Sequence, residues 1–175
     1  DEYPCIYHPQ DYEKVGYVQQ QVYLMDGTIA DNIALGVSKE NLDQELLKQA
    51  LEKASLSQFV ADLPNGVNST IGEGGTKISG GQRQRIGIAR ALYRKVEILF
   101  FDEATSALDE QTEKEISDAI NRLAETNLTI IIIAHRLKTL ERCDRIIDLG
   151  RIQNEKKITP KPNEPVKNST DLSKN

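Results

Sequence analysis

The chain has 175 residues, 38% of them hydrophobic and 28% charged, which suits one globular domain with its own core. The net charge of −5 argues against nucleic acid as the main partner, because duplex binding needs a basic surface, whereas a small phosphate ligand stays compatible. The sequence contains no run of about 18 apolar residues, so it predicts no membrane span, and its two widely separated cysteines are typical of reduced thiols in a cytosolic protein.

Residues 1–14 show no clear period, and the sequence starts without a methionine or a signal-peptide pattern. We therefore expect the chain to begin within a longer protein. Val15–Val18 is predicted to be a short strand, and the three glutamines at 19–21 lie in the loop that should follow it.

The next part, over about residues 37–95, is predicted to be a helical subdomain. Apolar residues recur with helical spacing from Leu42 to Ala54, and Ser38 is the predicted N-cap of this helix. A second short helix is predicted over residues 56–63, before a turn at 64–66 and a glycine-rich loop over 72–81.

A further helix is predicted from Gly80 to about Arg94, with Ser79 as its cap. Glycines 80 and 81 let a ligand approach the backbone, and the unpaired N–H groups at a helix N-terminus favour an anion such as phosphate. The alternative is an ordinary glycine loop with a serine cap, and these residues alone do not decide between the two.

The C-terminal half predicts a parallel β-α-β unit. Residues 98–101 and 128–133 are continuous apolar runs, typical of strands buried on both faces of a sheet, and residues 109–125 are predicted to form the crossover helix. Another strand is predicted over 145–149. Beyond Arg151 the sequence is poor in apolar residues and rich in proline, so we predict a domain over 1–150 and a disordered tail over 151–175.

Two acidic residues, Asp102 and Glu103, directly follow the first of these apolar strands. Ligands of open α/β sheets bind at the C-terminal ends of the strands, where one carboxylate can hold Mg²⁺ and the other can activate water. His135 follows the second apolar strand at the same edge. The alternative is that the acids begin a solvent-facing turn and that the histidine is structural.

Five segments, taken in order and spacing, resemble the ATP-binding cassette (ABC) ATPases over about residues 15–149. The family's motifs are the Q-loop, the signature, the Walker B strand with its catalytic glutamate, the D-loop and the switch histidine. They match, in this order, Gln20, Ile78–Gln82, Ile98–Glu103, Ser106–Asp109 and His135.

The resemblance implies an α/β fold: a parallel sheet core like that of P-loop NTPases, with an inserted α-helical subdomain, incomplete at the N-terminus. It implies ATP and Mg²⁺ as ligands, with Asp102 and Gln20 holding the metal, in part through water. The implied catalytic residues are Glu103 and His135, and the implied nucleotide-binding residues are Gln20, Ser79, Gly80, Gly81, Gln82 and Asp109.

The implied partners are a second ATPase domain, packed head to tail so that the signature acts in trans, and a transmembrane domain. Residues 26–33 are similar to exporter-type members, which implies a position at the cytoplasmic face of a membrane. The family's phosphate-binding motif G-x-x-x-x-G-K-[ST] does not occur, since Gly81 and Gln82 follow the glycine pair Gly75 and Gly80. We therefore expect this loop to lie upstream of the chain.

Two alternatives remain at this point. The chain could be a non-catalytic remnant or a partner that offers only a signature half-site, because the phosphate loop is missing from it. It could also belong to an ABC-type protein of DNA repair or translation, against which the acidic balance and the exporter-like stretch argue.

Overall fold

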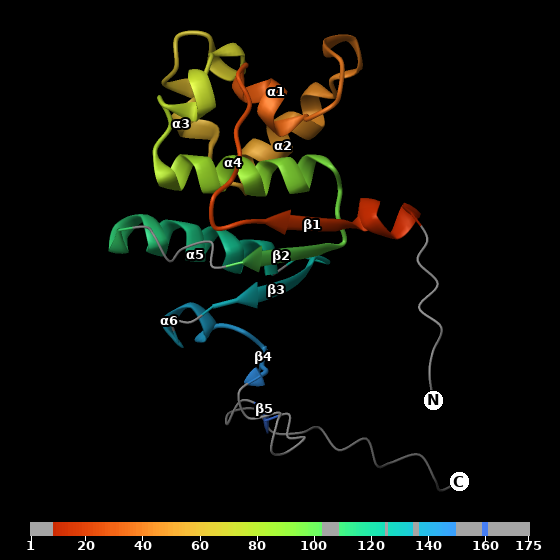
Figure 1. The fold of residues 1–175 in the computed structure, drawn as a ribbon, viewed down its shortest axis with the longest axis vertical. Coiled ribbons are helices and arrows are strands. Elements are labelled where there is room, and N and C mark those ends of the chain that lie inside the picture. The colour runs from red at the N-terminus through yellow and green to blue at the C-terminus, as the bar shows by residue number, and fades with distance from the viewer. Residues whose placement is uncertain (1–8, 103–108, 125, 135–136, 150–158, 161–175) are drawn as a thin grey trace, which may run out of the picture. The chain divides into compact units, whose positions relative to one another are not determined.

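The computed structural model describes residues 9–102, 109–124, 126–134, 137–149 and 159–160 (Figure 1). The chain divides into two compact units, 1–139 and 140–175. Among the described residues no helix has the length and the apolar character that crossing a bilayer requires.

The first unit is built on a parallel three-stranded sheet in the order β1-β2-β3. The strands are β1 (Val15–Val18), β2 (Ile98–Asp102) and β3 (Thr129–Ile133). Val18 lies beside Phe101, and Asp102 lies beside Ile133, so the three strands end at a common edge. The predicted α/β class and the predicted parallel unit are confirmed.

One face of the sheet packs against α4 (Gly80–Tyr93) and α5 (Glu110–Ala124). Leu99 and Phe101 point to this face and are fully buried. Helix α4 approaches β1 so closely that a side chain at Gly16 would meet the Ala91 Cβ at 2.9 Å. A glycine in β1 therefore permits the close packing of strand and helix.

The other face of the sheet carries apolar side chains that stay accessible. The exposed fractions are 53% for Tyr17, 40% for Ile131 and 47% for Ile133. The prediction that both apolar strands are buried on both faces is therefore wrong for the part of the chain that the structure describes. The reason is that α4 and α5 cover the same face, so side chains of opposite parity in β2 and β3 receive less cover.

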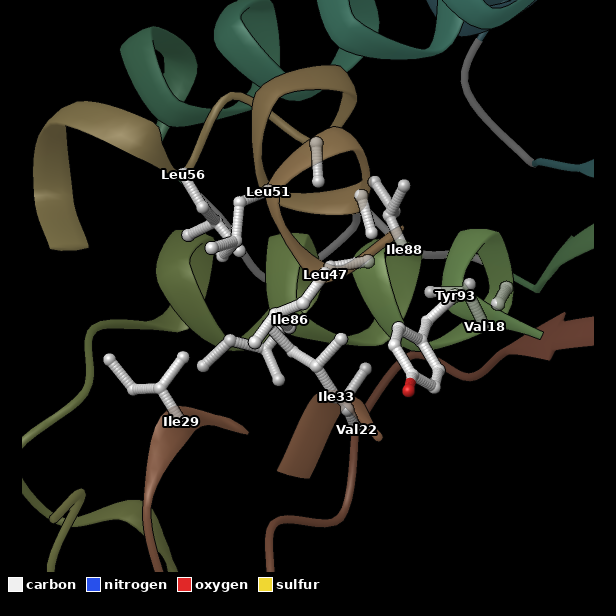
Figure 2. Packing of buried hydrophobic residues seen from close by; sticks show 14 of the residues in the cluster. Val18, Val22, Ile29, Ile33, Leu47, Leu51, Leu56, Ile86, Ile88 and Tyr93 are labelled. Atoms are coloured by element: carbon white, nitrogen blue, oxygen red, sulfur yellow. The ribbon is translucent and has the colours of Figure 1, made fainter. Parts of the chain in front are cut away.

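The helical elements between β1 and α4 are α1 (Ile29–Ile33), η2 (Lys39–Asn41), α2 (Gln44–Lys53), α3 (Ser57–Ala61), η3 (Gly66–Asn68) and η4 (Glu73–Gly75). Helices α1, α2 and α3 lie on the side of α4 that faces away from the sheet (Figure 1), and their buried apolar side chains pack against those of α4 (Figure 2). Ile86 and Ile88 of α4 are fully buried, and Leu47 and Leu51 pack in the same cluster.

The predicted N-cap of the first long helix is wrong. Ser38 precedes the short 3-10 helix η2 and makes no side-chain capping bond, whereas Asp43 caps α2 by accepting from the Leu46 N–H at 2.9 Å. Leu42 has extended backbone (φ −67°, ψ 115°), which separates the two helices. The apolar period continues across this break and therefore does not mark it.

Four short elements lie outside the sheet and the helices that pack on it. The 3-10 helix η1 (Pro9–Lys14) precedes β1, and α6 (Leu137–Leu140) follows β3. In the second unit β4 (Arg145–Ile146) pairs antiparallel with β5 (Thr159–Pro160) as a separate two-stranded sheet, so the predicted strand over 145–149 is shorter than expected. The rest of the predicted tail lies outside the described residues.

Candidate functional site

The C-terminal edge of the sheet carries the first group of predicted site residues. Gln20 follows β1 as an exposed residue, and Asp102 ends β2 as a partly buried one. Because β1 and β2 are neighbouring parallel strands, both residues lie at the same edge. Glu103, Ser106 and His135 lie outside the described residues.

A contact that the sequence did not suggest joins Tyr17 to Asp102. The Tyr17 hydroxyl donates a hydrogen bond to Asp102 Oδ2 at 2.5 Å, and the tyrosine ring lies 6.4 Å from the Phe100 ring. The bond to the carboxylate raises the pKa of Tyr17, because the protonated phenol is the donor. Tyr17 pairs with Phe100 in the register, so Asp102 is its diagonal neighbour on the same face, a relation that appears only when the strand pairing is known.

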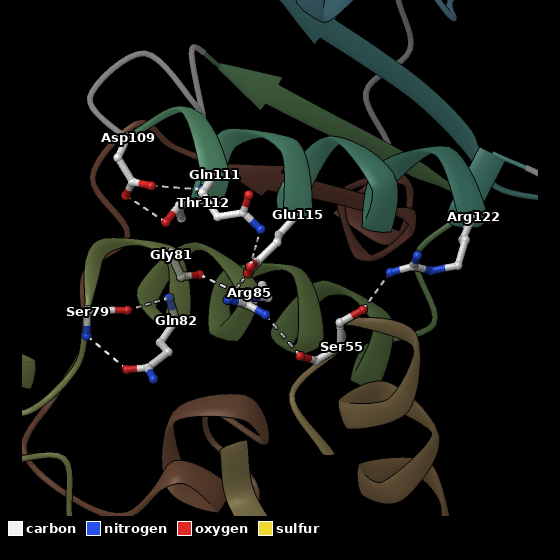
Figure 3. Close-up of polar contacts among 10 residues, drawn as sticks. All are labelled: Ser55, Ser79, Gly81, Gln82, Arg85, Asp109, Gln111, Thr112, Glu115 and Arg122. Atoms are coloured by element: carbon white, nitrogen blue, oxygen red, sulfur yellow. Dashed lines mark hydrogen bonds and ion pairs between the residues drawn. The ribbon is translucent and has the colours of Figure 1, made fainter. Parts of the chain in front are cut away.

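The N-terminus of α4 carries the second group of predicted residues. Ser79 Oγ accepts from the Gln82 N–H at 3.2 Å, and Gln82 Oε1 accepts from the Ser79 N–H at 2.9 Å, which forms a reciprocal capping box (Figure 3). The predicted cap is thus confirmed. Ser79 and Gly80 are exposed, and the Ser79 hydroxyl keeps its own proton to donate because the cap uses its oxygen only as an acceptor.

Gly81 lies in a tightly packed position at the start of α4. It is buried, and a Cβ there would lie 2.3 Å from the Thr112 Cγ2 of α5, so any larger residue collides with that helix. The sequence predicted that both glycines let a ligand approach the backbone. At Gly81 the close contact with α5 is a further reason why the position has no side chain. The start of α4 lies against the start of α5.

Asp109 lies just before α5, at this junction. Its Oδ1 accepts from the Thr112 N–H at 3.0 Å, and its Oδ2 accepts from the Thr112 hydroxyl at 2.7 Å. The hydrogen bond from the Thr112 side chain, followed by that from its N–H, lowers the pKa of Asp109. The structure therefore brings Asp109 close to the Ser79-led end of α4, as Figure 3 shows.

Arg85 holds this junction together and was not singled out in the sequence. Its Nη2 lies 3.0 Å from Glu115 Oε2 on α5, and its Nη1 donates to the Ser55 carbonyl at 3.2 Å. Its Nε donates to the Gly81 carbonyl at 3.4 Å. Both partners outside α4 are 30 residues away, so no local pattern could have revealed the contact.

Comparisons with known proteins all lead to one family. A family model described as "ABC transporter" matches residues 6–106. The chain is 46% identical over 142 residues to an ATP-dependent lipid A-core flippase of Cupriavidus pinatubonensis. The matched segment covers 79% of the chain and 24% of the flippase. It is 48% identical over 137 residues to ABC transporter B family member 14 of Arabidopsis thaliana, covering 78% of the chain and 11% of that protein.

A solved structure gives the same relationship. It is that of a bacterial Atm1-family ABC exporter with ATP bound, with a TM-score of 0.65 and 40% sequence identity over 76% of the chain and 23% of the exporter. The chain thus spans about a quarter of the flippase and of this exporter, and less of the plant protein.

Proposed function

Because the chain belongs to the ABC transporter family, we propose that it forms part of the ATP-binding and ATP-hydrolysing domain of an ABC exporter, which powers transport across a membrane. The observation that carries the proposal is the placement of Gln20 and Asp102 at one sheet edge in a fold shared with an ATP-bound exporter. Ligands of parallel α/β sheets bind at this edge.

The residues at the sheet edge fit a magnesium ion and a triphosphate. Asp102 offers a carboxylate and Gln20 an amide oxygen, and hard oxygen donors of this kind are what Mg²⁺ prefers. When bound, the ion would neutralise charge on the phosphates. Glu103 would orient and polarise the attacking water, and His135 would contact the γ-phosphate; both roles rest on the spacing of the motifs.

The start of α4 would act on the nucleotide of a second ATPase domain. The exposed Ser79 hydroxyl and the backbone N–H of Gly80 are donors at the positive end of a 14-residue helix, which favours a phosphate. Asp109, capping α5 beside it, would share this interface. Two domains packed head to tail would then form two nucleotide sites.

The loop that cradles the phosphates would come from another part of the exporter. The sequence contains no G-x-x-x-x-G-K-[ST] motif, and the relatives extend well beyond the matched segment. In this proposal each site combines that loop, the edge carrying Asp102 and Glu103, and the Ser79 end of the opposite domain. The chain would supply two of these three parts.

A transmembrane domain would dock near the loop that follows the glutamines. Tyr23 and Met25 are 77% and 39% exposed there, as apolar side chains that a partner can cover. The fully buried Asn32 fixes this loop, since its Oδ1 accepts from the Met25 N–H and its Nδ2 donates to the Met25 carbonyl, each at 3.0 Å. Such docking would place the domain at the cytoplasmic face of a membrane.

The proposal is tested by ATP turnover in the full-length exporter that carries this chain. We expect Glu103→Gln to reduce hydrolysis by roughly a hundredfold or more and to leave ATP trapped in a closed dimer, because the water loses its polarising carboxylate. Glu97→Gln is the matched control, since Glu97 is an exposed residue whose carboxylate forms an ion pair with Lys14 at 3.1 Å, away from the residues named above. Undiminished turnover in Glu103→Gln would remove the residue from this role.

A further inference from the structure

Gln84 is a buried polar residue in the middle of an otherwise apolar interface. It lies on α4 and is only 3% exposed. Its Nε2 donates to the Gln19 carbonyl at 3.1 Å and to the Gln20 carbonyl at 2.5 Å, both about 65 residues away in the sequence. One side-chain amide therefore satisfies two successive carbonyls where the chain leaves β1.

The chemistry of this contact is specific to glutamine. A neutral amide has two N–H donors on one atom, which is what two neighbouring carbonyls need. Glutamate would bring carboxylate oxygens against the same carbonyls, and asparagine is one methylene shorter. Methionine has a similar size but no donor, so it would leave both carbonyls without this bond.

A second observation indicates that the contact is more than a packing detail. Gln84 Oε1 is buried and has no hydrogen-bond partner among the described residues. Buried acceptors are almost always satisfied, so the unpaired Oε1 is a cost of this side-chain orientation. The same orientation directs Nε2 toward the carbonyls of Gln19 and Gln20. The neighbouring packing is tight as well, since a side chain at Gly87 would meet the Val22 Cγ2 at 2.8 Å.

We propose that Gln84 is a positioning residue that fixes the backbone of Gln19 and Gln20 to α4, the helix that Ser79 caps. Gln20 and Ser79 then move as one rigid piece. The inference rests on the proposed function, in which Gln20 serves the metal and water of one nucleotide site and Ser79 contacts the nucleotide of the other. Gln84 thereby couples the two sites through a single helix.

The test measures how ATP hydrolysis by the full-length exporter depends on Mg²⁺ concentration. Gln84→Met removes the hydrogen bonds to the Gln19 and Gln20 carbonyls at similar side-chain volume. Gln84→Asn keeps the amide group but holds it one methylene farther from these carbonyls. We expect either variant to raise the half-saturating Mg²⁺ concentration roughly tenfold, as for other groups that orient a metal ligand. Gln49→Met on the exposed side of α2 is the control and should leave it unchanged.

A purely structural role would lower the melting temperature and the rate but would leave the Mg²⁺ dependence as in the wild type, and that result in a folded variant would overturn the inference. If neither variant folds, hydrogen exchange of the wild type decides. Residues 19–22 and 80–87 must then gain protection together on nucleotide binding, and independent changes would overturn it. Hydrolysis that is insensitive to Glu103→Gln would instead contradict the proposed function itself.

Discussion

Arg85 on α4 and Glu115 on α5 form an ion pair, with Arg85 Nη2 3.0 Å from Glu115 Oε2. The arginine side chain is 17% exposed and the glutamate side chain 43%, so the pair is partly shielded from water. The same guanidinium also donates to the Ser55 carbonyl of the helical subdomain. One side chain therefore joins α4, α5 and the loop before α3.

Replacing this arginine should destabilise the chain more than replacing an exposed one. We expect Arg85→Met to lower the free energy of unfolding by about 1–3 kcal/mol, because partly buried carbonyls lose a charged donor. Arg122→Met is the comparison, since Arg122 donates to the Ser55 hydroxyl at an exposed position, and it should cost less than about 1 kcal/mol. Urea unfolding measures both, and equal costs would contradict the joining role of Arg85.

The fit of α4 against α5 depends on Gly81 and can be tested by a rescue. Gly81→Ala would place a Cβ only 2.3 Å from the Thr112 Cγ2 methyl. The resulting overpacking should lower the free energy of unfolding by about 1–3 kcal/mol. Thr112→Ser removes that methyl and keeps the hydroxyl that bonds Asp109. The double variant should therefore recover most of the loss; additive effects in the denaturation curves would argue against the close contact.

The pKa of Asp109 should respond to Thr112. The side-chain and backbone hydrogen bonds from Thr112 lower this pKa, so the stability they contribute is present above the ordinary aspartate value of about 3.9 and is lost as the pH falls through the lowered value. Thr112→Val removes the hydroxyl donor and should move the pKa of Asp109 up toward the ordinary value. A carbon-detected NMR titration of the Asp109 carboxyl group measures the shift, and an unchanged pKa would contradict the cause.

Substitutions of two neighbouring residues in β3 should change the stability of the 175-residue chain by very different amounts. Ile132 packs against the core, whereas Ile131 is 40% exposed on the opposite face. We expect Ile132→Thr to cost about 1–3 kcal/mol, because a hydroxyl enters the core, and Ile131→Thr to cost less than about 0.5 kcal/mol. Ile131→Thr should also reduce binding of the dye ANS to the accessible apolar face. A reversed order of the two stabilities would show that the strand register is wrong.

Much of the fold could be predicted from the sequence because its signals are local. The bounds of β1 follow from a short apolar run, and the start of α4 at Gly80 follows from a capping serine before two glycines and a glutamine. The choice between Ser38 and Asp43 as a cap was not predictable in this way. Both residue types cap helices, and the extended conformation of Leu42, which decides the matter, has no signature in the apolar period.

The sequence indicated where some residues of the candidate site lie in the fold, but it did not indicate the contacts that they make. Asp102 and Asp109 lie at a strand end and a helix start, as their positions after or before periodic segments indicated. The bonds of Tyr17 to Asp102 and of Gln84 to Gln20 cross 85 and 64 residues and depend on strand pairing and helix packing. Distant polar contacts of this kind leave no pattern in a single sequence.

In the proposed exporter the Ser79 end of one subunit completes the nucleotide site of the other, and mixed dimers of the full-length exporter test this arrangement. Ser79→Arg blocks the signature end and Glu103→Gln blocks hydrolysis, and the two changes are placed either in different subunits or together in one subunit beside a wild-type partner. We expect ATP hydrolysis only in the first case, because one site then combines an intact Ser79 with an intact Glu103 from opposite subunits. Hydrolysis only when both changes share one subunit would contradict it.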